Sequence, residues 1–389
     1  MYYKRTFTIA LLAAVALASA GAVSAGWDEG VAAFKAGDLQ SAAREFQEVV
    51  DQQPDLYQGH YMLGQTLIKM KRMQDALPHL RKAYDLNPND LGVQMVLGKA
   101  YTDSRRYADA VSVLGKIDAS KTGKHQVTLH QMLAKAYEKT GDEQRMRGQL
   151  KLAADADPSN ADLRYAYGAA AFNAGDMNGA LAALAKAVEL DPRDAGKQKT
   201  YAQALLRKGR TSKGNAKLDA YGKASTALSR VVAADGSYDN LIMLAGAQLG
   251  AKKYDEALAS LERAAGKNSN DWLPQFYMGQ AYTQKGQYRS AEEKLNQALT
   301  KASKNEDKVT IYGQLGYVYE KQKRYDNAIA AYRSAGDSNG VRRAEENKQT
   351  EEFNKDVEAE AKAIAELKAE EARLKEQLKS LPGAKPPVP

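Results

Sequence analysis

Apolar residues recur along most of this chain in pairs of short segments with helical spacing. In the stretch "YMLGQTLIKMKRMQDALPHLRKAYDLNP", Leu63 and Leu67 are four residues apart, and so are Ala76 and Leu80. Residues four apart share one face of an α-helix, so each segment predicts an amphipathic helix. Polar breaks such as "NAGD" (residues 173–176) predict a short turn between the two helices. The pattern therefore indicates a series of helical hairpins.

These hairpins return at a fixed interval. "DQQP" ends at Pro54 and "DLNP" at Pro88, while "DADP" ends at Pro158 and "ELDP" at Pro192. The interval from Pro54 to Pro88 is the same as the interval from Pro158 to Pro192. A constant period of about 34 residues indicates that the chain is an array of similar two-helix units, each stacked on its neighbours.

Particular residue types also recur within the units. A large apolar residue is followed by a small one, as at Leu63–Gly64, Leu97–Gly98, Leu133–Ala134, Tyr167–Gly168, Met278–Gly279 and Leu315–Gly316. The small residue allows two helices to approach closely. A turn glycine takes a positive φ at the end of the first helix, and the proline is expected in the first turn of the following unit.

This spacing closely resembles that of the tetratricopeptide repeat family, over residues 26–340. The resemblance implies an all-α fold, a right-handed superhelix of about nine helix-turn-helix repeats. We expect the first helices of the repeats near residues 26–36, 57–70, 91–103, 127–140, 161–174, 195–208, 238–251, 272–285 and 309–322.

The sixth repeat departs from the pattern, because its second helix resumes about ten residues late, near Ala224. The insert, residues 211–224, is basic and contains glycine. It is either a longer loop or helix extension, or an element that docks a partner.

The composition changes after Gly340. Residues 341–381 are dense in Glu, Lys and Ala and predict one long charged helix whose start caps the last repeat. A roughly heptad apolar stripe permits a short coiled coil, although Glu360 and Glu371 fall at its core positions. Residues 382–389 are expected to be a disordered, proline-rich tail.

The N-terminal segment resembles a secretory signal. Lys4 and Arg5 precede an apolar run, and Val23 and Ala25 place small residues before the expected cleavage after Ala25. Cleavage after Ala20, or an uncleaved membrane anchor, are the alternatives. With residues 1–25 removed, we expect an exported protein, most simply periplasmic. It is not a lipoprotein, because the chain has no cysteine.

Composition and motifs favour binding over catalysis. The sequence contains no cysteine and only four histidines, none at the spacing of a helical metal site, and no phosphate-binding or nucleophile-elbow motif. We therefore predict no catalytic residues, no cofactor and no metal. The formal net charge is +8, but the basic residues are scattered among acidic ones, and we expect no nucleic-acid partner.

In the resembled family, the first helices line a concave groove. The corresponding stripe offers aromatic residues, amides and a few lysines, which suit an extended peptide. The groove is predicted at Trp27, Tyr61, Gln65, Met95, Lys99, Gln131, Lys135, Tyr165, Lys199, Gln203, Phe276, Gln280 and Tyr317. The alternative for each aromatic is packing between repeats.

The favoured hypothesis is a non-enzymatic adaptor of the cell envelope that binds a partner peptide or protein in this groove. One alternative is an oligomeric structural or assembly factor organised by the C-terminal helix. The other is a binder of an anionic envelope polymer through the basic repeat region.

Overall fold

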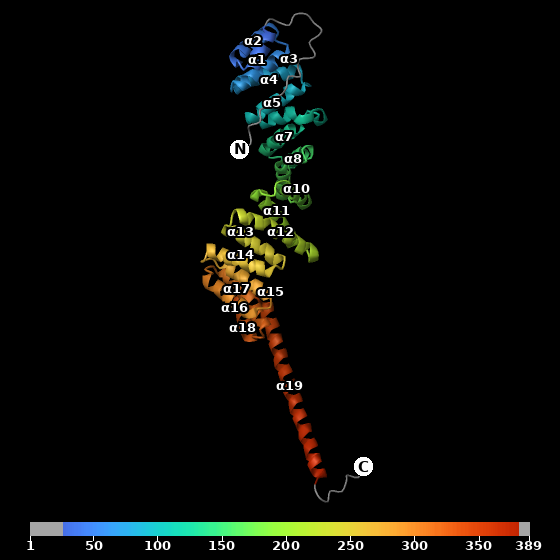
Figure 1. Ribbon diagram of the computed structural model, residues 1–389, viewed down its shortest axis with the longest axis vertical. Helices are drawn as coiled ribbons and strands as arrows, with labels where there is room; N and C mark the ends of the chain where they lie inside the picture. Colours follow the sequence, from blue (N-terminus) through green and yellow to red (C-terminus); the bar gives the residue numbers. More distant parts are fainter. Residues whose placement is uncertain (1–25, 381–389) are drawn as a thin grey trace, which may run out of the picture. The chain divides into compact units, whose positions relative to one another are not determined.

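The computed structural model describes residues 26–380, which form an all-α chain of nineteen helices and two short 3₁₀ helices (Figure 1). Eighteen helices make nine consecutive pairs, and α19 follows them. This confirms the predicted fold class. The predicted signal peptide (1–25) and proline-rich tail (382–389) lie outside the described residues.

The chain divides into two compact units, Met1–Leu190 and Asp191–Pro389. The first contains α1 (Trp27–Ala36), α2 (Leu39–Gln52), α3 (Tyr57–Lys69), α4 (Met73–Leu86), α5 (Leu91–Asp103), α6 (Tyr107–Leu114), η1 (Ala119–Lys121), η2 (Gly123–His125), α7 (Gln126–Thr140), α8 (Glu143–Ala156), α9 (Ala161–Asn173) and α10 (Met177–Leu190). The second contains α11 (Ala195–Thr211), α12 (Gly214–Ala234), α13 (Tyr238–Gly250), α14 (Tyr254–Lys267), α15 (Leu273–Gln284), α16 (Tyr288–Lys301), α17 (Asn305–Lys321), α18 (Tyr325–Ser334) and α19 (Ser338–Lys379).

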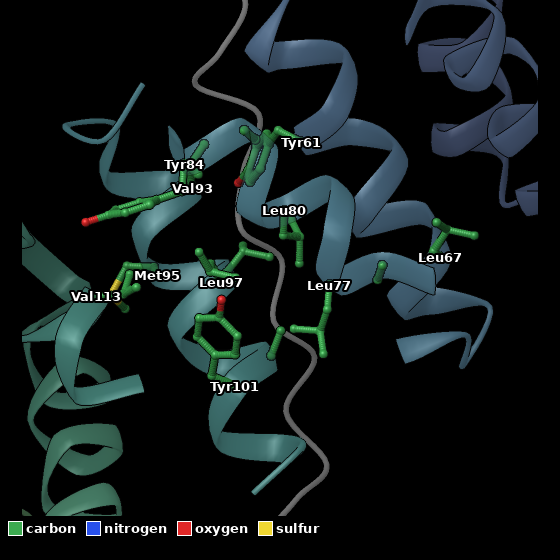
Figure 2. Close-up of a cluster of buried hydrophobic side chains, with 14 of the residues drawn as sticks. Tyr61, Leu67, Leu77, Leu80, Tyr84, Val93, Met95, Leu97, Tyr101 and Val113 are labelled. Carbon is green, nitrogen blue, oxygen red and sulfur yellow. The ribbon is translucent and has the colours of Figure 1, made fainter. Parts of the chain in front are cut away.

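The core of each pair forms where the recurring small residue meets a large one. In α5, a Cβ added at Gly98 would lie 2.2 Å from Leu114 Cδ2 of α6, so only glycine permits this approach. Figure 2 shows the same cluster, with Leu80 of α4 beside Leu97 and Tyr101 of α5. Burial of each such leucine stabilises the fold by about 2 kcal/mol. The predicted role of the small residue is thus confirmed.

The turn inside each pair uses the left-handed backbone region. Gly141 (φ 79°) and Gly286 (φ 73°) occupy it as predicted. Where glycine is absent, a basic residue takes the same conformation, namely Lys71, Arg105, Lys252 and Lys323, with φ between 57° and 63°. A side chain in this region is strained by about 1 kcal/mol, so these turns are held by the packing of the helices around them.

The recurring prolines do not open the next helix, contrary to the sequence expectation. Pro54 and Pro88 lie in the turn between pairs, three residues before the following helix begins. Their carbonyl oxygens accept hydrogen bonds from side chains six residues later, from His60 Nε2 at 2.9 Å and from Gln94 Nε2 at 2.9 Å. Of the prolines in the described residues, Pro274 is the one recorded in the first turn of a helix.

The insert of the sixth repeat is helical. It forms the end of α11 and the first turns of α12, which has 21 residues where α14 and α16 have 14. Seven additional residues lengthen α12 by about 10 Å. The helix-extension alternative is therefore the observed structure.

Helix α19 begins as a cap on the last pair, as predicted. Ala344 is buried against Ala328 and Tyr332 of α18, and Arg343 Nη2 donates to Glu320 Oε2 at 3.0 Å. Beyond Glu351 the side chains of α19 are exposed, and the helix extends past α18. Its docked part is therefore the N-terminal third.

Candidate partner-binding groove

The thirteen residues predicted to line a groove fall in both compact units. Tyr61, Met95 and Phe276 are buried, with 8, 6 and 7% of their surface exposed. Six are partly buried and four are exposed; the exposed ones are Gln131, Lys135, Gln203 and Tyr317. The stripe is therefore not one uniform surface.

Two of the predicted aromatics are held by packing, Tyr61 between repeats and Trp27 within the first repeat. The Tyr61 hydroxyl approaches α5, where a Cβ at Gly92 would lie 3.0 Å from it. Burial and the nearby Asp90 carboxylate raise the pKa of Tyr61. The Trp27 ring meets Phe46 edge to face, with centroids 5.9 Å apart. Little of the Tyr61 side chain is free to contact a partner, and part of Trp27 is covered by Phe46.

Two of the more exposed positions are engaged with neighbours on their own helices. Lys99 forms an ion pair with Asp103, one turn later. The Lys321 ammonium lies over the Tyr317 ring, 5.3 Å from its centroid. Both contacts are exposed, so a partner can displace them at a cost below about 1 kcal/mol.

A cleft of about 980 Å³ lies within the second unit. The first helices of successive pairs, α11, α13, α15 and α17, supply most of its wall. The lengthened start of α12 supplies most of the remainder, with Lys252 from the turn after α13 and Tyr254 from the start of α14. It is lined by Leu206, Arg210, Gly214, Asn215, Lys217, Leu218, Tyr221, Ile242, Met243, Gly246, Leu249, Gly250, Lys252, Tyr254, Tyr277, Gln280, Gln284 and Gln314. This volume is large enough to hold several residues of a peptide.

Glycines in α13 create this space. Gly246 and Gly250 stand one repeat before Gln280 and Gln284, and a Cβ added at Gly246 would meet no atom within 4 Å. Tyr221 of α12 fills part of the room at Gly250. A Cβ there would lie 2.4 Å from Tyr221 Cγ, and one at Gly209 of α11 would lie 2.9 Å from Tyr221 Cε2. Tyr221 is thus packed against two helices.

The lining is cationic and amide-rich. Arg210, Lys217 and Lys252 are exposed, and none of the described residues forms an ion pair with them. None of the described residues lining the cleft is Asp or Glu. Three glutamines supply amide donors and acceptors. The arrangement favours a negatively charged ligand whose peptide N–H and C=O groups still need hydrogen-bond partners.

Of the predicted stripe, the cleft contains Gln280 alone. The sequence prediction named no residue of the first helix of the seventh repeat, α13, although Ile242, Met243 and Leu249 of this helix line the cleft. The insert was the available signal, since residues 214–221 of α12 form one wall.

Three of the four histidines, His60, His79 and His130, have side-chain hydrogen-bond partners. His60 Nε2–H donates to the Pro54 carbonyl, so a neutral His60 ring accepts at Nδ1 from His79 Nδ1–H, with the two nitrogens 3.2 Å apart. His130 Nδ1 lies 2.7 Å from Gln149 Oε1.

Within residues 26–380, no three His, Cys, Asp or Glu side chains are grouped for a metal ion. In that same part of the chain no helix has the length and hydropathy needed to cross a membrane.

Comparison with known proteins identifies the repeat. Two tetratricopeptide repeat models match, one at residues 27–91, 132–195 and 276–340, the other at residues 67–135. No curated protein matches the chain.

Several solved structures are similar to parts of the chain. The C-terminal part of a TPR repeat-containing protein from Cytophaga hutchinsonii is 13% identical, with a TM-score of 0.42 over 62% of this chain and 93% of that one. YrrB, described as a TPR protein with an unusual peptide-binding site, is 17% identical, with a TM-score of 0.39 over 50% of this chain and 100% of that one. MamA from Desulfovibrio magneticus RS-1 is 18% identical, with a TM-score of 0.36 over 45% and 93%. At these values the similarities say nothing about function.

Proposed function

The chain belongs to the tetratricopeptide repeat family, and from this we propose that it is a non-enzymatic scaffold that binds a partner protein in the cleft of its second unit. The observation that supports the proposal is the cleft itself. It is about 980 Å³, lies on the first helices of consecutive repeats, and combines aliphatic, amide and cationic lining. Such a mixture suits an extended peptide, whose backbone needs hydrogen bonds while its side chains need apolar contact.

Site-specific photo-crosslinking tests this function. A photoreactive phenylalanine analogue at Met243 lies in the cleft, whereas the same analogue at exposed Glu262 of α14 lies outside the lining. We expect a protein adduct in native cells from the Met243 position, with mass spectrometry identifying one recurring partner. Equal adducts from both positions, or none from Met243, would contradict a binding role for the cleft.

We also propose that the protein acts after export into the cell envelope. The support is the sequence of residues 1–25, with its basic start, apolar run and small residues before Gly26. Cleavage after Ala25 would make Gly26 the new N-terminus, and its nitrogen already donates to Glu29 Oε2 at 3.2 Å. Intact mass and N-terminal sequencing of the protein from its native envelope fraction test the proposal. A chain that still begins at Met1 refutes it.

Self-association through α19 is a second candidate function, because part of this helix has no partner within the described residues. Phe353, Ile364, Leu367 and Leu378 are more than half exposed on its roughly heptad stripe. However, Glu371 at a core position pairs with Lys375 of its own helix at 2.6 Å. Light scattering of residues 26–389 and 26–355 tests this role, because the shorter chain keeps the docked turns of α19. If each chain has the mass of its own monomer, this role is ruled out.

A further inference from the structure

We propose that the protruding hairpin of α11 and α12 makes the cleft selective for an acidic, extended peptide segment that also carries an aliphatic side chain. This inference rests on the proposed function and specifies its ligand. Helix α11 has 17 residues where α13 has 13, and α12 has 21 where α14 has 14. The additional turns raise one wall of the cleft above the level of the next pair.

The positive charges of the cleft gather at one rim. Arg210 lies in the last turn of α11, Lys217 near the start of α12, and Lys252 in the turn from α13 to α14. All three are therefore at the turn ends of their helix pairs. At other turns of this kind Arg72 is paired with Asp75 and Lys323 with Glu351, whereas Lys71 and Arg105 have no ion pair among the described residues. The cleft differs in gathering three such cations along one rim. Three cations without a carboxylate partner in the described residues are complementary to an acidic ligand.

The floor of the cleft is apolar. Leu206, Ile242, Met243 and Leu249 are all partly exposed, and Gly246 leaves open space among them. Aliphatic side chains of a ligand lose contact with water by filling that space, which favours binding. Gln280, Gln284 and Gln314 reach the same cleft and are suited to bond the ligand backbone.

This lining argues for a peptide over other polyanions. Binding of sugar rings or bases relies on free aromatic faces for stacking. Two of the three tyrosines in the lining are engaged: Tyr221 is packed against Gly209 and Gly250, and Tyr277 lies against Phe276 with ring centroids 5.7 Å apart. Tyr254 is the third, so the cleft presents one partly exposed ring and no series of stacking faces. The cleft instead offers aliphatic contacts, which neither a sulfated polysaccharide nor an oligonucleotide exploits.

Fluorescence polarisation with residues 26–389 tests the inference. The probe is a fluorescein-labelled peptide, Gly-Glu-Leu-Glu-Glu-Leu-Glu-Gly, and its matched control has each Glu replaced by Gln. We expect the acidic peptide to bind about tenfold or more tightly at low salt, with the difference shrinking as salt rises.

Two variants locate the binding. The triple variant R210Q, K217Q and K252Q removes the rim charges and should weaken the acidic peptide about tenfold. Its matched control, R230Q, K267Q and K304Q, changes net charge equally at exposed positions outside the lining and should bind normally. Gly246→Trp should abolish binding by filling the floor. Gly266→Trp in α14, where an added Cβ also meets no atom within 4 Å, should not.

Several outcomes would overturn the inference. One is that the acidic peptide does not bind at millimolar concentration. Another is that the Gln peptide binds with equal affinity. A third is that a heparin oligosaccharide or an oligothymidylate competes for the cleft as well as unlabelled acidic peptide does. If the Met243 crosslink persists in any of these cases, the scaffold function stands and only the ligand class is wrong. If the crosslink is also absent, the cleft itself is not a binding site.

Discussion

Replacement of Gly250 by alanine measures how firmly Tyr221 is held against α13. The added Cβ would lie 2.4, 2.5 and 2.7 Å from three carbons of the Tyr221 ring. Carbon atoms in contact prefer about 3.5–4.0 Å, so the ring or the helix must shift by about 1 Å. Overpacking of this size destabilises a core by about 1–3 kcal/mol.

Helix propensity works in the opposite direction. An alanine in place of glycine inside a helix stabilises it by up to about 1 kcal/mol. At Gly250 the clash outweighs this gain, and we expect a net loss of about 1–2 kcal/mol. Gly246, one turn earlier in the same helix, is the matched control, because its Cβ would meet nothing within 4 Å. Gly246→Ala should therefore stabilise the protein by about 0.5–1 kcal/mol.

A double-mutant cycle isolates the contact. With Tyr221→Ala in place the clash disappears, and Gly250→Ala should change from destabilising to stabilising. The free energies come from urea unfolding followed by circular dichroism, and hydrogen exchange of α12 and α13 amides localises the effect. If Gly250→Ala has the same sign and size as Gly246→Ala, Tyr221 does not pack on α13 and the proposed wall of the cleft is incorrect.

Contacts elsewhere in the chain support three more predictions. Burial and the neighbouring His60 lower the pKa of His79, so its imidazole binds a proton more tightly in the unfolded state than in the folded state. The free energy of unfolding should therefore fall as pH drops below about 6.5. Urea titrations at a series of pH values should show this fall, and His79→Asn should make it smaller. Burial alone would raise the pKa of Glu320, but hydrogen bonds from Arg343 and Tyr332 lower it, so docking of α19 should weaken as pH falls below about 4. The first turns of α19 should lose protection from hydrogen exchange at that pH in the wild type. In Glu320→Gln the same amides should be as poorly protected at neutral pH as those of the wild type are at low pH. At the turns, Gly141→Ala forces alanine into φ 79° and should lower the thermal midpoint, and an unchanged midpoint would show that this turn relaxes freely.

Much of the fold was predictable because its determinants are local. The spacing of Leu63, Leu67, Ala76 and Leu80 specifies two amphipathic helices whatever surrounds them. The small residue after the large one, as at Gly98, encodes the close approach of the pair. The charged composition after Gly340 encodes a long helix. These features determine helix count, period and pairing within each repeat.

The sequence was a poorer guide to which residues of the predicted groove are exposed to solvent. Tyr61, Met95 and Phe276 share the inward stripe with exposed Gln131 and Gln203, yet they are buried. Which stripe residue is covered depends on the size of the side chain that the next repeat presents. That neighbour lies a full repeat away along the chain, and the period of a single helix contains no information about it.

Helix periodicity, turn chemistry and the small-residue contacts all act inside one repeat, so the order of residues is enough to specify a stack of helical hairpins. The position of the open surface depends instead on how assembled repeats fit together. Assembly places Tyr221 of the insert against Gly250 of the following repeat, leaves space at Gly246, and holds the prolines in turns anchored by His60 and Gln94. The physical reason is that a cleft remains where the side chains of neighbouring repeats fail to fill the space between them. A glycine such as Gly246 lines open space only once the helices around it are packed.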